Sequence, residues 1–204
     1  FWLASRYISE ESKEKYLLIN EKLQKIYLLN NKKVVIDSMG NSGKAPGEFL
    51  SMNEIAVNDN GYIVIYDYNN QRLNLIKIID DKLKLVKMRI YDDFIRGLAI
   101  DEQNNIFIAV SPEKQEFKFI RKLDIELKEK FAFNDKKMKQ TKRLIDTLKD
   151  FSANLACYNE NLFVCYENKL FLEKFKLNDE AVEDIFTKEI EAKSYYPVSE
   201  ELFG

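Results

Sequence analysis

An internal repeat constrains the fold of this sequence more than any other feature. The segment EIAVNDNGYIVIYDY, which starts at Glu54, is matched position by position by GLAIDEQNNIFIAVS, so that Leu98 takes the place of Ile55 43 residues later. In a third copy, NLACYNENLFVCY, Leu155 takes the same place. A segment that recurs in this way is a structural unit, whereas a binding loop would occur once.

Each copy consists of short strand-like runs. The Asn60–Gly61 turn between two apolar runs predicts a tight β-hairpin, because such turns need positive φ angles. RLNLIKI and LKLVKMRI follow with alternating apolar and polar residues, which makes four predicted strands in about 40 residues. This period predicts an all-β fold, a β-propeller of repeated four-stranded antiparallel blades. Hairpins within a sandwich or barrel are the alternative.

The predicted blades form a single propeller domain or part of one. They cover residues 7–48, 49–93, 94–133 and 151–192. Phe49, Phe94 and Phe151 each introduce a copy, and the first blade looks shorter, without a clear innermost strand.

An insertion, NDKKMKQTKRLIDTLKD, lies between the third and fourth blades at residues 134–150. Its apolar residues recur at a partial helical spacing, so we expect one helical segment. A solvated helix packed on the propeller edge is the favoured interpretation, and a lid or partner-binding helix is the alternative. Its positive charges are too few to indicate nucleic-acid or membrane binding in a nearly neutral chain.

The second copy resembles the NHL repeat, a family of propeller blades. The matching residues are Gly40, Gly43, Pro46, Gly47, Glu48, Phe49, Asp59, Gly61, Asp67, Asn70 and Arg72. The later copies keep the strand rhythm but lose this motif, since Val110 stands where Asp67 would be. The chain also resembles the divergent six-bladed propellers of Bacteroidetes, many of which are exported. This resemblance implies an exported protein and a six-bladed ring.

The length of 204 residues accommodates about four blades, whereas six would need roughly 250 residues or more. We therefore favour an incomplete part of a larger ring over a closed four-bladed one. The chain begins with Phe1 and has no signal-peptide pattern, which indicates a mature form, a trimmed form or a fragment. The compartment and the oligomeric state stay open.

Composition limits the classes of function. The net charge of −2 argues against a nucleic-acid binder, which would need a basic surface, and no apolar run is long enough to span a membrane. The absence of histidine removes Ser-His-Asp and Cys-His catalysis and histidine metal sites. We expect no cofactor, metal or catalytic residue. Cys157 and Cys165 are expected as buried free thiols, with a cross-strand disulfide as the alternative.

One loop face of the propeller is the predicted binding surface. It comprises residues 39–54, 67–72, 91–96, 110–116 and 134–152, which should emerge together. The candidate ligand-binding residues are Asn69, Asn70, Arg72, Arg96 and Lys114. In DYNNQR, however, the favoured interpretation is that Asp67 and Arg72 pair with each other and the backbone. The glycine-rich GNSGKAPGE is interpreted as an inter-blade turn rather than a phosphate loop, because no helix follows it.

These observations predict a non-enzymatic binding module for a protein, peptide or glycan. A propeller hydrolase or lyase of the lactonase type is the alternative, for which the innermost strands offer Glu54, Asn58, Asp101 and Asn154. A purely structural scaffold is a third possibility.

Overall fold

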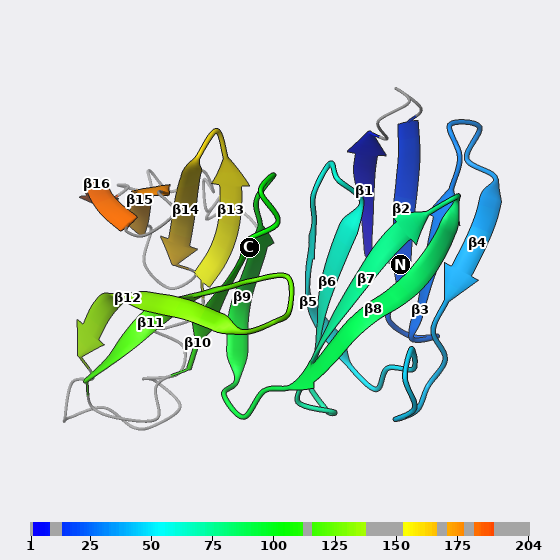
Figure 1. Cartoon of the computed structure of the whole chain (residues 1–204), viewed down its shortest axis with the longest axis horizontal. Coiled ribbons are helices and arrows are strands. Elements are labelled where there is room, and N and C mark those ends of the chain that lie inside the picture. The colour runs from blue at the N-terminus through cyan, green and yellow to red at the C-terminus, as the bar shows by residue number, and fades with distance from the viewer. Residues whose placement is uncertain are drawn as a thin grey trace, which may run out of the picture.

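The computed structural model describes residues 2–8, 14–111, 116–137, 153–166, 171–177 and 182–189 (Figure 1). These residues form four antiparallel sheets of four strands each, which we number as blades 1 to 4. Within every blade the strands pair in chain order. The strands are β1 (Trp2–Ile8), β2 (Glu14–Asn20), β3 (Lys25–Leu29) and β4 (Val35–Met39) in blade 1, β5 (Met52–Val57), β6 (Tyr62–Asp67), β7 (Arg72–Ile79) and β8 (Lys82–Ile90) in blade 2, β9 (Ile95–Ile100), β10 (Ile106–Val110), β11 (Glu116–Leu123) and β12 (Glu129–Lys137) in blade 3, and β13 (Ala153–Tyr158), β14 (Asn161–Tyr166), β15 (Phe171–Leu177) and β16 (Val182–Glu189) in blade 4.

The predicted repeat and its hairpins are confirmed. Ile55 and Leu98 both lie on the first strand of a blade and pair with Ile65 and Ile108 of the second strand. Gly61 has a φ of 77°, so the Asn60–Gly61 turn adopts the positive φ that was expected.

Two details of the prediction are wrong. Blade 1 has a complete set of four strands and begins before residue 7, because β1 pairs with β2 along its length. The expected helical insertion at 134–150 does not begin at residue 134, because β12 continues to Lys137. Residues 138–150 lie outside the described part of the chain. The described residues contain no helix.

Successive blades share hydrophobic cores. We call the face of a blade that lies toward the next blade in the chain its leading face, and the opposite face its trailing face. Leu17 and Ile26 of blade 1 pack with Ile63 and Ile76 of blade 2. Alternate residues of a strand point to opposite faces, so Val64 on the leading face of blade 2 joins the next core, with blade 3. The third core joins blades 3 and 4.

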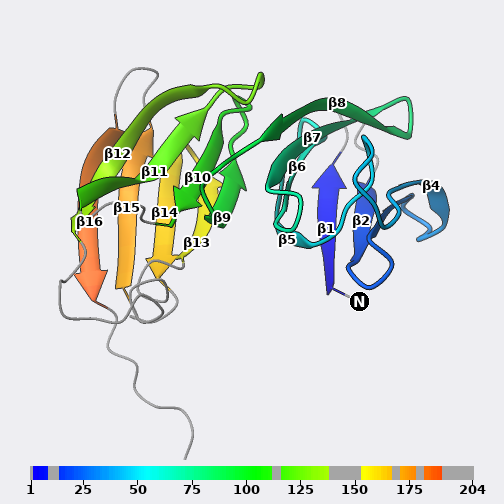
Figure 2. The ribbon, with the colours of Figure 1, turned by 90° about the horizontal axis from the view of Figure 1, so that it is seen from below.

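The inner strands of neighbouring blades approach closely. β9 lies beside β5 on one side and β13 on the other, as Figure 2 shows from below. A Cβ atom placed on Gly97 of β9 would lie 2.2 Å from the carbonyl oxygen of Ala153 in β13. Only glycine therefore fits at this crossing of two blades.

Candidate functional site

The described loops of the predicted binding face do come together. The amide of Tyr68 donates to the carbonyl of Ser51, and the amide of Tyr91 donates to the carbonyl of Gln71, both at 2.8 Å. The amide of Ser111 likewise donates to the carbonyl of Phe94 at 2.8 Å. In each case a loop between two blades is tied to a loop between the second and third strands of a blade.

The motif residues of blade 2 anchor these loops from inside. Asp67 is 0% exposed, and its carboxylate accepts hydrogen bonds from the amides of Leu50 at 3.1 Å and Ser51 at 2.9 Å. Arg72 is 5% exposed and donates to the carbonyls of Lys44 at 2.9 Å and Glu48 at 2.5 Å. Its Nη2 lies 3.6 Å from Oδ2 of Asp67. The pairing favoured from the sequence is present, and Arg72 lies in the interior rather than on the ligand-accessible surface.

The other candidate residues of this face differ in position. Asn69 is exposed, whereas Asn70 donates to Asp67 at 2.6 Å and to the carbonyl of Gly43 at 3.1 Å. Arg96 is half-buried and donates to the Ser111 hydroxyl at 3.1 Å. Lys114 lies outside the described residues. Among the described residues of the predicted set, only Asn69 is exposed to solvent.

The glycine-rich turn is stabilised by the carboxylate of Glu48, which lies within the turn. The amide of Ala45 donates to Oε2 of Glu48 at 3.0 Å, and Gly40 has a φ of 106°. Phe49 is fully buried and forms an isolated β-bridge with Ser42. This geometry is that of an inter-blade turn.

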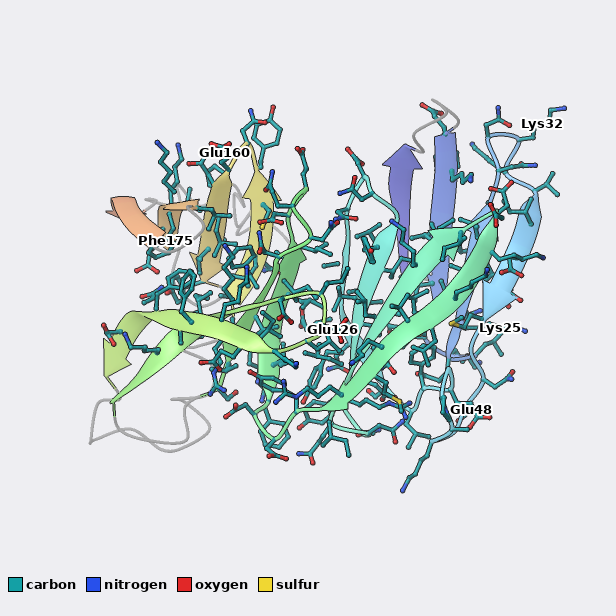
Figure 3. All side chains as sticks on the ribbon, viewed as in Figure 1. Lys25, Lys32, Glu48, Glu126, Glu160 and Phe175 are labelled. Atoms are coloured by element: carbon teal, nitrogen blue, oxygen red, sulfur yellow. The ribbon has the colours of Figure 1, made fainter. Side chains whose placement is uncertain are left out.

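A hollow lies at the opposite ends of the strands. It has a volume of about 540 Å³ and is formed by the turns between the first and second strands of blades 2, 3 and 4. In Figure 3, Glu48 marks the lower loop face and Glu160 marks the upper end, where these turns lie. We call it the first-turn pocket. It is lined by Val57, Asn58, Asp59, Ile100, Asp101, Glu102, Gln103, Cys157, Tyr158, Asn159, Glu160, Asn161 and Leu177.

Asn and Asp side chains shape the turns of blades 2 and 3 in the same way. Oδ1 of Asn58 accepts from the amide of Tyr62 at 3.0 Å, and Oδ1 of Asp101, 43 residues later, accepts from the amide of Asn105 at 2.7 Å. Asn58 also donates to the carbonyl of Asp101 at 2.8 Å and to Asn104 at 2.8 Å. These bonds fix the two turns against each other, so this side of the pocket is preformed.

The turn of blade 4 is shorter and exposes an aromatic ring. Asn159 and Glu160 have φ angles of 45° and 59°, which are typical of a two-residue type I′ hairpin turn. Tyr158 precedes them and is 68% exposed. The pocket therefore combines a tyrosine with carboxylates and amides.

The electrostatic character of the pocket is negative. Among the described residues, its lining contains the carboxylates of Asp59, Asp101, Glu102 and Glu160 and no Lys or Arg side chain. Burial, together with the negative charge of Asp101, raises the pKa of the Cys157 thiol well above its usual range, although Lys122 opposes the shift. The thiol is therefore neutral near pH 7 and is a poor nucleophile.

The two cysteines are separated by the register of their strands. Cys157 pairs with Leu162, whereas Cys165 pairs with Asn154, so the two side chains point to opposite faces of blade 4. Both are free thiols, and both are half-buried rather than buried. The alternative of a cross-strand disulfide is wrong.

The innermost strands enclose a smaller hollow of about 320 Å³. Glu54 and Asn154 both line it, whereas Asn58 and Asp101 line the first-turn pocket, so the four polar residues proposed for a channel site divide between two places. Within the described residues, no group of three or more His, Cys, Asp or Glu side chains is arranged to hold a metal ion.

No helix in the described part of the chain is long and apolar enough to cross a membrane. No family model and no curated protein matches the sequence. Solved structures do match, although their sequence identity is low. The chain is similar to streptogramin B lyase (TM-score 0.55, 11% identity, 93% of this chain and 55% of that one). It is also similar to U3-55K (0.54, 11%, 90% and 52%) and to a protein of unknown function from Bacteroides caccae (0.51, 10%, 85% and 57%).

The chain spans about half the length of each of these three structures. Its sheets follow one another as consecutive blades, and each blade is packed against its neighbours through shared cores. On this arrangement and these structural neighbours, the chain has a β-propeller fold.

Proposed function

We propose that this chain is a non-enzymatic binding module whose ligand contacts the first-turn pocket. The observation that carries the proposal is the meeting of three turns from successive blades around one hollow of about 540 Å³, one side of which is fixed by hydrogen bonds. The loop face expected from the sequence is the weaker candidate, because Arg72 and Asn70 are engaged in anchoring their own loops there.

The charge of the lining favours one class of ligand, a protein or peptide segment that carries Lys or Arg. Four carboxylates and no Lys or Arg stand among the described lining residues, so the lining attracts a positive group, and the partly enclosed setting limits screening by salt. Tyr158 adds an exposed ring on which a guanidinium or ammonium group can rest. A glycan is the competing class from the sequence, since amides and an aromatic ring also suit sugar hydroxyls.

The finer assignment of the fold is also a proposal. We infer that blade 2 is of the NHL type, supported by the Asp67–Arg72 network that its motif forms. The six-blade count and export remain predictions from the resemblance.

An array of short synthetic peptides tests the proposal directly. The peptides differ only in a central residue, which is Lys, Arg, Gln or Glu. We expect retention on the Lys and Arg peptides. Glu102→Gln and Glu160→Gln should each weaken it about two- to fivefold, as for exposed ion pairs. Asp135→Asn, which removes an exposed carboxylate from β12 outside the pocket, is the matched control and should leave retention unchanged.

Equal retention on all four peptides, or retention unaffected by the two pocket variants, would contradict the proposal. A parallel glycan array separates the competing ligand class. Binding there that is lost on Tyr158→Ala, with no peptide binding, would move the assignment to a glycan.

A further inference from the structure

The turn between β5 and β6 contains the only Asn-Gly pair of the sequence, Asn60–Gly61. Asparagine followed by glycine is prone to deamidation, because glycine has no side chain to hinder attack by its backbone nitrogen. In this reaction the Gly61 nitrogen bonds to the side-chain amide carbon of Asn60, and ammonia leaves with the Gly61 proton. Water then opens the cyclic succinimide to aspartate or isoaspartate, so water is the only co-reactant.

The side chain of Asn60 is occupied by contacts with the next blade. Its Nδ2 donates to the carbonyl of Glu102 at 2.6 Å and to Oδ1 of Asn104 at 3.0 Å. Both partners lie in the turn between β9 and β10 of blade 3. Attack requires the side-chain amide of Asn60 to rotate toward the Gly61 nitrogen, and this rotation breaks both hydrogen bonds. The contacts between the two turns therefore oppose the reaction.

The backbone of the turn is held as well. The Gly61 amide donates to the carbonyl of Asn58 at 3.0 Å, so the proton that must leave is already in a hydrogen bond. The carbonyl of Gly61 accepts from the amide of Ile78 in β7 at 2.9 Å, and the carbonyl of Asn60 accepts from the ammonium group of Lys77. These bonds hold the peptide that joins Asn60 to Gly61, so the turn must open locally before it can react.

Asn104 is the residue of blade 3 that makes the most contacts with this turn through its side chain. Its Oδ1 accepts from Asn58 at 2.8 Å as well as from Asn60. Its φ is 65°, a conformation that glycine adopts without strain. Asn104→Gly therefore removes the acceptor while the backbone of the turn between β9 and β10 can keep its conformation.

We propose that Asn60 is a deamidation site, protected as long as the first turns of blades 2 and 3 stay docked. The site reacts when the two turns separate, and the product cannot restore the contact. Aspartate or isoaspartate at this position has no N–H group to donate to Glu102 and Asn104, and its negative charge faces two oxygen acceptors. The loss of ammonia makes the change permanent. The site is independent of which ligand the first-turn pocket binds.

Peptide mapping by mass spectrometry, after incubation of the 204-residue chain at mildly alkaline pH, measures conversion at Asn60. The reference is the same chain unfolded in guanidinium chloride. We expect conversion in the folded chain to be about ten- to a hundredfold slower, as for two hydrogen bonds that must break first. Asn104→Gly removes one of these bonds and should raise the rate in the folded chain about two- to tenfold.

Two control variants separate opening of this turn from general effects. Lys33→Gly also replaces a positive-φ residue by glycine, but in an exposed turn of blade 1. Val110→Ala lowers global stability from the far end of β10 without touching the turn. Both should leave the rate at Asn60 close to that of the wild type, and circular dichroism checks that each variant is folded.

The proposal is overturned if Asn60 converts as fast in the folded chain as in the unfolded chain. It is also overturned if a folded Asn104→Gly chain converts at the wild-type rate, or if either control raises the rate as much as Asn104→Gly does. An Asn104→Gly chain that is unfolded is replaced by Asn104→Asp, which keeps an acceptor at this place and should leave Asn60 protected; loss of protection there would overturn the proposal too.

Discussion

Asp67 should contribute more to stability than any apolar side chain at the same place in a blade. Its carboxylate accepts from the amides of Leu50 and Ser51 and from the side chain of Asn70, and it faces the guanidinium of Arg72 at 3.6 Å. Asp67→Ala leaves these donors without their acceptor in a site that is 0% exposed.

The magnitude follows from burial and charge. A hydrogen bond to a charged group contributes about 1.5–3 kcal/mol, and removing one partner of a buried ion pair costs about 3–5 kcal/mol. These contributions overlap, because the loop can relax and admit water, so we expect a total loss of about 3–5 kcal/mol. Val110→Ala is the control, since Val110 occupies the equivalent position of blade 3 and is 1% exposed. It loses two methyl groups, or about 1.6 kcal/mol before any cavity effect.

Urea unfolding followed by circular dichroism measures both variants against the wild type. Asp67→Asn, which keeps the shape but not the charge, should fall between wild type and Asp67→Ala. If Asp67→Ala is no more destabilised than Val110→Ala, the motif does not anchor the loops as its geometry indicates.

Three further predictions concern packing, pH and thiol chemistry. Gly97→Ala places a methyl group against the carbonyl of Ala153, so the urea midpoint should fall by the equivalent of about 1–3 kcal/mol, whereas an unchanged midpoint would mean that the strands can separate freely. Partial burial raises the pKa of Asp37, but hydrogen bonding from the Leu83 amide and the charge of Lys82 bring it below its ordinary value. This stabilisation is present above the unfolded pKa, about 3.9, and is lost as pH falls through the folded pKa; the stability difference between wild type and Asp37→Asn should therefore vanish in acid and persist at pH 7. Iodoacetamide should alkylate Cys157 in the folded chain at least about tenfold more slowly than a thiol in a short peptide near pH 8, because burial raises its pKa, and peptide-level mass spectrometry would reveal a fast reaction that contradicts this.

The repeat was predictable from the sequence because strands and tight turns leave local signals. The alternation of apolar and polar residues around Ile55 and Leu98 can be recognised from a few neighbouring residues, and so can the Asn60–Gly61 turn. The first strand of blade 1 was not predicted from the sequence. Its segment, WLASRYI, alternates only weakly between apolar and polar residues, and polar residues separate it from its partner strand in the sequence.

The pocket was harder to predict, because it depends on distances between blades. Each of its turns looks like ordinary hairpin chemistry, and only the ring geometry brings Asp59, Glu102 and Glu160 around one hollow. A sequence signal did exist, since an acidic or amide residue recurs in the first turn of three successive copies. Conversely, the polar segment DYNNQR was predicted to contribute Arg72 to ligand binding, although Arg72 donates to backbone carbonyls in the interior of the fold.

The three shared cores also determine how stability is distributed along the chain. Each core joins a blade only to the blades next to it in the sequence. The cooperativity of unfolding is therefore that of a one-dimensional array in which only neighbouring blades interact. Among the described residues, blades 2 and 3 take part in two such cores, whereas blades 1 and 4 take part in one. In the 204-residue chain, local opening should therefore cost the most free energy near β6 and β10, which would give those amides the slowest hydrogen exchange.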